Sequence, residues 1–251
     1  MKNHIKTIIR SLVLEAMREL APGQKPKMIF LAGGAGSGKS TILRALDVQG
    51  KGFVTIDPDE AFEEALRQSN HDLNLSKTET EFFEMKDKFD AAVKAKDSKK
   101  IAELRPEFER LAKQNKERGT MFIASLRAAT AKAVDLAKEQ HDFVVDGTGG
   151  NYNHIAELNE TFKGLGYNTA MIFVHVELAT SLKRNQERGA KGGRSLRDSV
   201  IEKSWENVHK NEQLFRELFG ASFFYIDAEN LERSFGEVVG DITRFMRYLK
   251  P

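Results

Sequence analysis

The most informative segment of this chain is Gly33-Gly34-Ala35-Gly36-Ser37-Gly38-Lys39-Ser40-Thr41. It fits G-x-x-x-x-G-K-[ST], the pattern of a phosphate-binding P-loop. Glycines let the backbone curl until successive N–H groups point inward at phosphate oxygens. In this pattern Lys39 reaches the outer phosphates and the Ser40 hydroxyl holds Mg²⁺. The predicted nucleotide-binding residues are Gly34, Ala35, Gly36, Ser37, Gly38, Lys39, Ser40 and Thr41.

The motif is specific only when a strand precedes it and a helix follows it. Residues 27–32 (KMIFLA) form a short apolar run, which is long enough for a buried strand. Residues 41–46 (TILRAL) continue with the apolar spacing of a helix. Both flanks favour a P-loop over a flexible Gly/Ser loop that happens to contain the same letters.

Composition sets outer limits on the class of protein. The chain has 251 residues, of which 30% are charged and 40% apolar, as in an ordinary globular protein. A net charge of +2 does not by itself require nucleic acid or an acidic membrane as a partner. Cysteine is absent, which excludes disulfides and thiolate metal sites. The polar start at residues 1–4 does not resemble a secretory signal, so we expect a cytoplasmic protein without a membrane span.

Five apolar runs alternate with helical patterns along the chain. This alternation predicts a parallel sheet with helices on both faces. We therefore predict a three-layer αβα P-loop NTPase with about five parallel strands in the kinase-like order 2-3-1-4-5. The expected strands are residues 27–32, 52–56, 143–146, 169–176 and 223–227.

Helical patterns fill the rest of the chain. An amphipathic helix is predicted over residues 5–20, and a helical insertion over about residues 70–118. Pro106 and Gly119 are expected to break the insertion from the helix that follows it. Without repeats or low-complexity linkers, we interpret residues 1–251 as a single domain with a basic lid at about residues 184–197.

Three aspartates follow predicted strands, at the edge where open α/β sheets bind ligands. Asp57 and Asp59 come after the second strand, and either could accept the proton of an acceptor hydroxyl. The alternative for Asp59 is a capping role at a helix that begins at Glu60. Asp146 ends the third strand, where it could hold Mg²⁺ or contact the acceptor.

Arginines gather in the predicted lid. Arg184 and Arg188 share one helix face, and Arg194 and Arg197 follow a glycine-rich bend. Guanidinium groups suit the charge that builds up on a transferring phosphoryl group. Arg188 and Arg194 are the stronger candidates, since Arg184 also fits an ordinary solvated helix face.

The motifs in this order resemble the zeta-toxin-like P-loop kinases. The resemblance rests on the P-loop, on I-D-P-D at residues 56–59, on V-V-D-G-T-G at residues 144–149, and on E-R-G…G-G-R at residues 187–194. It extends over about residues 27–219. It implies an enzyme that uses ATP and Mg²⁺ to phosphorylate a sugar hydroxyl of a UDP-N-acetylhexosamine. It also leaves room for an antitoxin-like protein partner.

The resemblance assigns roles to particular residues. It implies that Asp59 is the base, that Lys39 binds phosphate, and that Arg188 and Arg194 are the lid arginines. Asp146 and Thr148 take the positions that contact the acceptor. We include Asp57 with them as a candidate substrate-binding residue.

Several departures from the family pattern fall on the acceptor side. Asp146 stands where the toxins carry glutamate, and Gly150 where they carry arginine. The spacing from Arg188 to Arg194 is shorter than theirs, and the helical insertion is large. The acceptor could therefore be a small molecule, or instead a polynucleotide end or a modified base in nucleic acid.

Two other classes of function compete with a kinase. One is an ATPase that uses water as the acceptor, and the other is a nucleic-acid-binding module that uses ATP. The strand-end aspartates and the arginine-rich lid favour the kinase. A GTPase is disfavoured because residues 115–118 (NKER) fail the N-K-x-D pattern at their last position.

Overall fold

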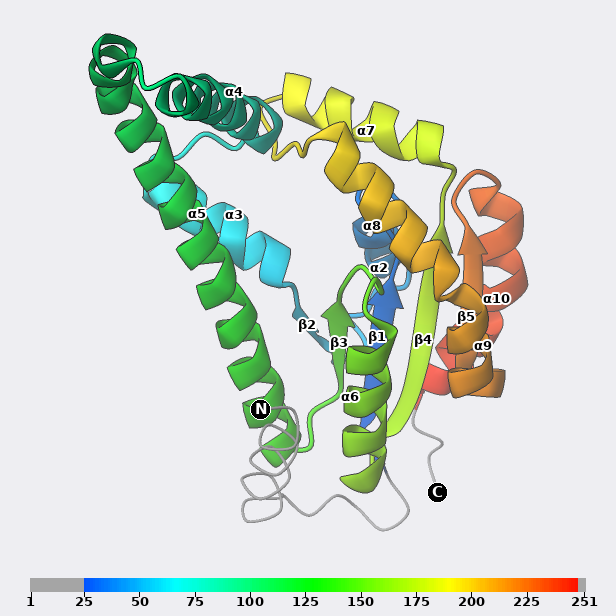
Figure 1. Ribbon diagram of the computed structural model, residues 1–251. Helices are drawn as coiled ribbons and strands as arrows, with labels where there is room; N and C mark the ends of the chain where they lie inside the picture. The colour runs from blue at the N-terminus through cyan, green and yellow to red at the C-terminus, as the bar shows by residue number, and fades with distance from the viewer. Residues whose placement is uncertain (1–24, 248–251) are drawn as a thin grey trace. The chain divides into compact units, whose positions relative to one another are not determined.

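The computed structural model of the chain describes residues 25–247 (Figure 1). The amphipathic helix predicted over residues 5–20 lies outside the described residues. Within residues 25–247, no helix is both long and apolar enough to cross a membrane.

The sheet has five parallel strands in the order β2-β3-β1-β4-β5, which confirms the predicted order. β1 lies at the centre, where Leu31 pairs with Asp146 of β3 and with Ile172 of β4. β2 is shorter than predicted, and β4 begins and ends one residue earlier than predicted. The strand bounds are β1 (Lys27–Ala32), β2 (Val54–Ile56), β3 (Phe143–Asp146), β4 (Asn168–His175) and β5 (Phe223–Asp227).

Helices connect the strands in the alternating pattern of an α/β fold. α3 begins at Pro58, so Asp59 is the second residue of this helix. The alternative reading, in which Asp59 caps a helix that begins at Glu60, is therefore wrong, and the role of Asp59 as a base stays a prediction. The helix bounds are α2 (Lys39–Ala45), α3 (Pro58–Gln68), α4 (Leu75–Lys94), α5 (Ser98–Lys138), α6 (Tyr152–Gly164), α7 (Leu178–Ala190), α8 (Asp198–Lys210), α9 (Glu212–Phe219), the 3-10 helix η1 (Gly220–Ser222) and α10 (Leu231–Met246).

Side chains alternate across the sheet and build one apolar cluster on each face. Phe30, Met171 and Phe173 pack with α6, α8 and α9 and with the end of α5. Ile29 and Ile172 pack on the opposite face with α2 and α10 (Figure 1). Because both faces of the sheet are covered, the strands read as near-continuous apolar runs.

The chain folds into two compact units. The first unit holds the sheet and the P-loop, and consists of residues 1–58, 128–182 and 201–251, of which those within 25–247 are described. The second unit consists of residues 59–127 and 183–200. Its small core joins Phe62 and Leu66 of α3 to Leu75 of α4. Phe89 of α4 stacks on Phe108 of α5, with ring centroids 4.4 Å apart.

The predicted break between helices at Pro106 and Gly119 is wrong. Both residues lie inside α5, a continuous helix of 41 residues. A proline inside a helix costs one hydrogen bond, here the bond to the carbonyl of Ala102. Pro106 and Ala102 are exposed, so water can satisfy that carbonyl. The stacked Phe108 and the buried Leu111 anchor the turn that follows the proline.

Candidate functional site

The P-loop turns directly from β1 into α2 in the first unit. Gly38 precedes α2 with a φ of 95°, a conformation that glycine adopts without strain. Gly33 is the first residue of the loop. A Cβ added to Gly33 would lie 2.6 Å from the Ser37 hydroxyl and 2.7 Å from the Val174 carbonyl oxygen. The sequence uses glycine here because the loop passes so close to β4 and to its own later turn.

Lys39 lies at the start of α2 and reaches back across the loop. Its ammonium donates to the Gly33 carbonyl at 2.9 Å and lies 3.7 Å from the Asp146 carboxylate. The side chains of Lys39 and Asp146 are 15% and 9% exposed. This ammonium is therefore fixed in place and largely withdrawn from water, and low dielectric strengthens its attraction for an anion.

The predicted strand-end carboxylates of the first unit lie on neighbouring strands. Ile56 pairs with Val145, so Asp57 and Asp146 follow at the same level of the carboxyl edge of the sheet. The loop after β3 is tied to the P-loop, since the Gly33 N–H donates to the Thr148 carbonyl at 2.9 Å. The exposed Thr148 hydroxyl accepts from the Gly150 N–H at 3.3 Å. Asp57, Asp146 and Thr148 are thus brought to one edge, as predicted.

Three residues that the sequence analysis missed support this edge. The Ser181 hydroxyl, fully buried on α7, donates to the Ala35 carbonyl of the P-loop. Asn211, buried between α8 and α9, donates to the Gly149 carbonyl at 3.0 Å. The backbone of α8 at Trp205 lies 3.9 Å from where a Cβ of Gly34 would be. No local spacing marks these residues, because each acts through a partner far away in the sequence.

Oxygen ligands for Mg²⁺ are available beside the lysine. Magnesium is commonly held by one or two protein oxygens together with substrate phosphates. The exposed Ser40, in the first turn of α2, and the buried Asp146 carboxylate offer such oxygens. The Ser37 hydroxyl is buried and has no hydrogen-bond partner among the described residues. The donors present therefore fit a nucleotide with its magnesium ion.

The second unit carries the other predicted residues as one charged cluster. Arg194 holds the Asp59 carboxylate with both terminal nitrogens, at 2.8 Å and 3.1 Å. Its Nε lies 3.2 Å from Glu63, one turn further along α3. The Arg194 side chain is only 8% exposed, whereas that of Asp59 is 47% exposed. A bidentate arginine fixes the orientation of a carboxylate.

Arg188, near the end of α7, lies in the same cluster. Its Nε and one terminal nitrogen are buried and have no hydrogen-bond partner among the described residues. Burial lowers the pKa of the Arg188 guanidinium, and the nearby Arg194 adds to this effect, while Glu63 and Asp59 oppose it. Buried donors on a cation are costly to leave unpaired, so this guanidinium is suited to bind an anion.

The predicted lid is anchored within the second unit. The Asn185 side chain bonds both the N–H and the carbonyl of Leu196, at 2.9 Å and 2.8 Å. The Ser195 hydroxyl donates to Asn74, just before α4, at 2.9 Å. Arg197 pairs with Glu79 at 3.0 Å and lies over the ring of Phe83. Arg197 is therefore engaged with α4, whereas Arg188 and Arg194 belong to the cluster around Asp59.

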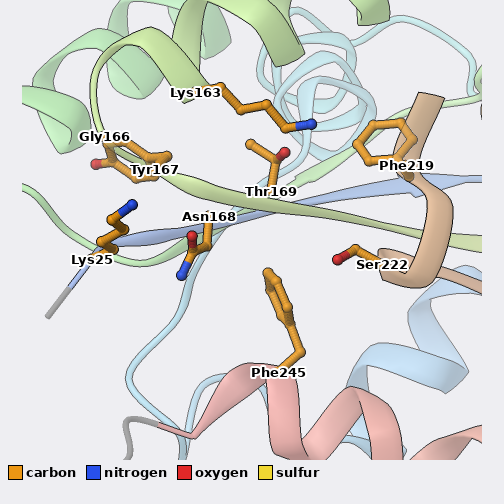
Figure 2. A pocket seen from close by; sticks show the side chains of 9 residues that line it. All are labelled: Lys25, Lys163, Gly166, Tyr167, Asn168, Thr169, Phe219, Ser222 and Phe245. Carbon is orange, nitrogen blue, oxygen red and sulfur yellow. The ribbon is translucent and has the colours of Figure 1, made fainter. Parts of the chain in front are cut away.

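A separate cavity of about 530 Å³ lies at the opposite, amino edge of the sheet. It is lined by Lys25 just before β1, by Thr169 at the start of β4, and by Lys163 at the end of α6. Figure 2 shows Lys163, Thr169 and Phe219 on one side of β4, and Phe245 on the other. This cavity is not part of the phosphate cradle, which follows the carboxyl end of β1.

A family model for the AAA domain matches residues 28–211, which include the P-loop, the three aspartates and both lid arginines. No curated protein matches the chain. The fold is that of kinase-like P-loop proteins.

The chain is similar to solved structures at low sequence identity. A proposed kinase from Chloroflexus aurantiacus is 11% identical with a TM-score of 0.51, and the match covers 90% of this chain and 96% of that one. A chain of the Pnkp1/Rnl/Hen1 RNA repair complex is 16% identical with a TM-score of 0.49. That match covers 78% of this chain but only 49% of the repair protein.

Proposed function

The chain belongs to the AAA domain family, and we propose that it is an ATP-dependent kinase. In this proposal it moves the γ-phosphate of ATP to a hydroxyl group of a nucleotide-type acceptor, such as a UDP-N-acetylhexosamine. The observation that carries the proposal is the P-loop ammonium of Lys39, which is held beside Asp146 and is largely withdrawn from water. The arginine-oriented carboxylate of Asp59, within the second unit, supports it.

The first unit supplies the nucleotide site. The amides of residues 34–38 and the Lys39 ammonium bind the phosphates, with Ser40 and Asp146 as oxygen ligands for Mg²⁺. Bound Mg²⁺ supplies neutralisation of phosphate charge. Ser181 and Asn211 hold the surrounding backbone in place, so the cradle is formed before nucleotide arrives.

The second unit supplies the groups that act on the transfer itself. Asp59 accepts the proton of the acceptor hydroxyl while the hydroxyl oxygen bonds to the γ-phosphorus. At the same time, the bond between the γ-phosphorus and the oxygen that bridges it to the β-phosphate breaks, and ADP leaves. Arg194 keeps the Asp59 carboxylate oriented for this role. Arg188, with its buried unpaired donors, and Arg194 stabilise the charge on the transferring group.

The acceptor is proposed from the resemblance to zeta-toxin-like kinases. Asp57 and Thr148, with Asp146 as a further candidate, would bind it through its hydroxyl groups. The exposed Thr148 hydroxyl and the strand-end carboxylates suit a polyhydroxylated ligand such as a nucleotide sugar. The departures at Asp146 and Gly150 make the acceptor the first point to test.

The test is to incubate the full chain with γ-labelled ATP and Mg²⁺, together with separate panels of UDP-sugars, nucleosides, and DNA or RNA ends. Label transferred to a UDP-N-acetylhexosamine supports the proposal in full. Label on a nucleic-acid end supports a kinase with a different acceptor. Label found only in free phosphate with every acceptor would refute the kinase and leave an ATPase.

Two variants separate binding from transfer. Lys39→Ala should abolish transfer and weaken ATP binding, because it removes the ammonium held at Gly33 and Asp146. Asp59→Asn keeps the size of the side chain and should abolish transfer while leaving ATP affinity nearly unchanged. Full transfer activity in Asp59→Asn would show that Asp59 serves only to hold Arg194.

A further inference from the structure

Two side chains on adjacent turns of α8 contact the carboxyl end of β4. The Trp205 indole N–H donates to the carbonyl of Val176 at 2.7 Å. His209 lies with its Nε2 2.8 Å from Nδ1 of His175, the last residue of β4. The two aromatic rings on α8 also stack on each other, with centroids 4.0 Å apart. All of these residues belong to the first unit.

The hydrogen-bond partners determine where the protons lie. Nδ1 of His209 is 2.8 Å from the Trp205 carbonyl, which can only accept, so this nitrogen carries the proton. Nε2 of the neutral His209 ring must then accept, and His175 donates to it from Nδ1. Nε2 of His175 remains available and lies 3.6 Å from Glu177. This hydrogen bond needs a lone pair on one of the two facing nitrogens, so it is lost once both of them carry a proton.

The same stretch of α8 lies close to the P-loop and holds the loop after β3. A Cβ added at Gly34 would lie 3.9 Å from the Cα of Trp205, and Asn211, just beyond α8, donates to the Gly149 carbonyl. The Thr148 carbonyl of that loop accepts a hydrogen bond from the Gly33 N–H. The segment from Trp205 to Asn211 is thus bonded to the end of β4 and, through the loop after β3, to the start of the P-loop.

We propose that His209 is a positioning residue for nucleotide binding: its hydrogen bond with His175 holds α8 in place behind the P-loop, and the second proton taken up by the pair releases it. The inference rests on the proposed nucleotide site. Neither the P-loop motif nor the strand-end aspartates predict a role for His209 in nucleotide binding.

The hydrogen bond survives one added proton on the pair but not two. With one added proton, the Nε2–H of His175 faces Glu177 and the bond between the rings remains. With the second, Nε2 of His209 becomes a donor that faces the Nδ1–H of His175, and the bond is lost. Burial lowers the pKa of His209, the neighbouring His175 lowers it further, and the Trp205 carbonyl opposes the shift. The other titratable or charged groups around the pair are Glu212 and Arg216 on α9, and Tyr225 and Asp227 on β5.

The direction of the pH effect follows from the lowered pKa. The ordinary pKa of histidine is about 6.5. Because the pKa of His209 is lower than this, the ring is neutral above about pH 6.5 and the hydrogen bond holds. The effect appears below that pH, as His209 begins to protonate. The hydrogen bond should therefore hold at neutral pH and be lost at the acidic end of the range.

The experiment measures ATP affinity of the full chain with Mg²⁺ by calorimetry from about pH 5 to pH 8. His209→Gln keeps an acceptor and a donor but does not titrate, and His209→Phe keeps the ring but not the acceptor. Dividing wild-type affinity by variant affinity at each pH cancels the titration of ATP itself. His141→Gln, at an exposed histidine that pairs with Glu139, is the matched control and should bind as wild type does.

We expect His209→Gln to match wild type at neutral pH and to bind more tightly than wild type at the acidic end. His209→Phe should bind about threefold to tenfold more weakly at neutral pH, as for the loss of one buried hydrogen bond. Thermal unfolding at each pH identifies any variant that has not folded. Proton–nitrogen spectra of the imidazoles should place a proton on Nδ1 of both rings at neutral pH.

A ratio of wild-type to His209→Gln affinity that stays constant with pH would overturn the inference, as would wild-type binding by His209→Phe. A proton on Nε2 of His209 at neutral pH would overturn the hydrogen-bond assignment directly. If the wild-type chain binds no ATP at any pH, the proposed function fails first. Binding with no difference among the variants overturns the positioning role alone.

Discussion

Replacing Gly33 by alanine tests the close approach on which the P-loop depends. The new Cβ would lie 2.6 Å from the Ser37 hydroxyl and 2.7 Å from the Val174 carbonyl oxygen. The carbonyl cannot retreat easily, because Val174 is buried in β4 and pairs with Ile226 of β5. The overpacking should cost about 1–3 kcal/mol. The φ of 154° adds strain of about 1–2 kcal/mol for a residue with a Cβ.

These two terms predict a loss of about 2–5 kcal/mol, which corresponds to a fall in Tm of roughly 4–20 °C for a chain of this size. ATP affinity should fall as well, because the strain can be relieved only by moving the loop. The measurements are thermal unfolding and calorimetric ATP binding.

The control is Gly119→Ala, in α5, where a new Cβ would have no neighbour within 4 Å. Alanine there should stabilise the helix by up to about 1 kcal/mol. A Gly33→Ala protein with wild-type Tm and wild-type ATP affinity would refute the packing argument.

Three further predictions test other parts of the structure. Arg194→Gln removes the partner of Asp59 and should lower the transfer rate by at least about 10²-fold, while ATP affinity changes by less than about tenfold; radiolabel transfer and calorimetry check this. Asn211→Ala leaves the Gly149 carbonyl without its buried donor and should lower the free energy of unfolding by about 1–2 kcal/mol in urea titrations. Phe108→Ala removes the ring stacked on Phe89 and should cost about 1–3 kcal/mol, measured in the same way. Wild-type values in any of these three variants would contradict the corresponding contact.

The sequence was sufficient to predict the sheet because its signals are local. The P-loop requires a strand before it and a helix after it, and the apolar runs at residues 143–146 and 223–227 match β3 and β5. The edge position of β2 and the central position of β1 agree with the predicted strand order.

The errors occurred where tertiary contacts outweighed local preference. Pro106 and Gly119 are ordinary helix breakers, yet α5 continues through both because its exposed side tolerates the lost bond. The roles of Ser181, Glu63 and Asn211 could not be predicted, since each depends on a partner brought close only by folding. A sequence pattern identifies a phosphate loop, but it does not identify what keeps that loop in shape.

The ion pair between Lys39 and Asp146 has a consequence for how nucleotide affinity is interpreted. Before nucleotide arrives, the lysine already has a counterion supplied by the neighbouring strand. In the proposed site, an incoming triphosphate would compete with Asp146 for the Lys39 ammonium, and Mg²⁺ would give that carboxylate a replacement partner. The net affinity is then a difference between two sets of charge interactions, and metal and nucleotide should bind cooperatively because each compensates for the partner that the other takes away.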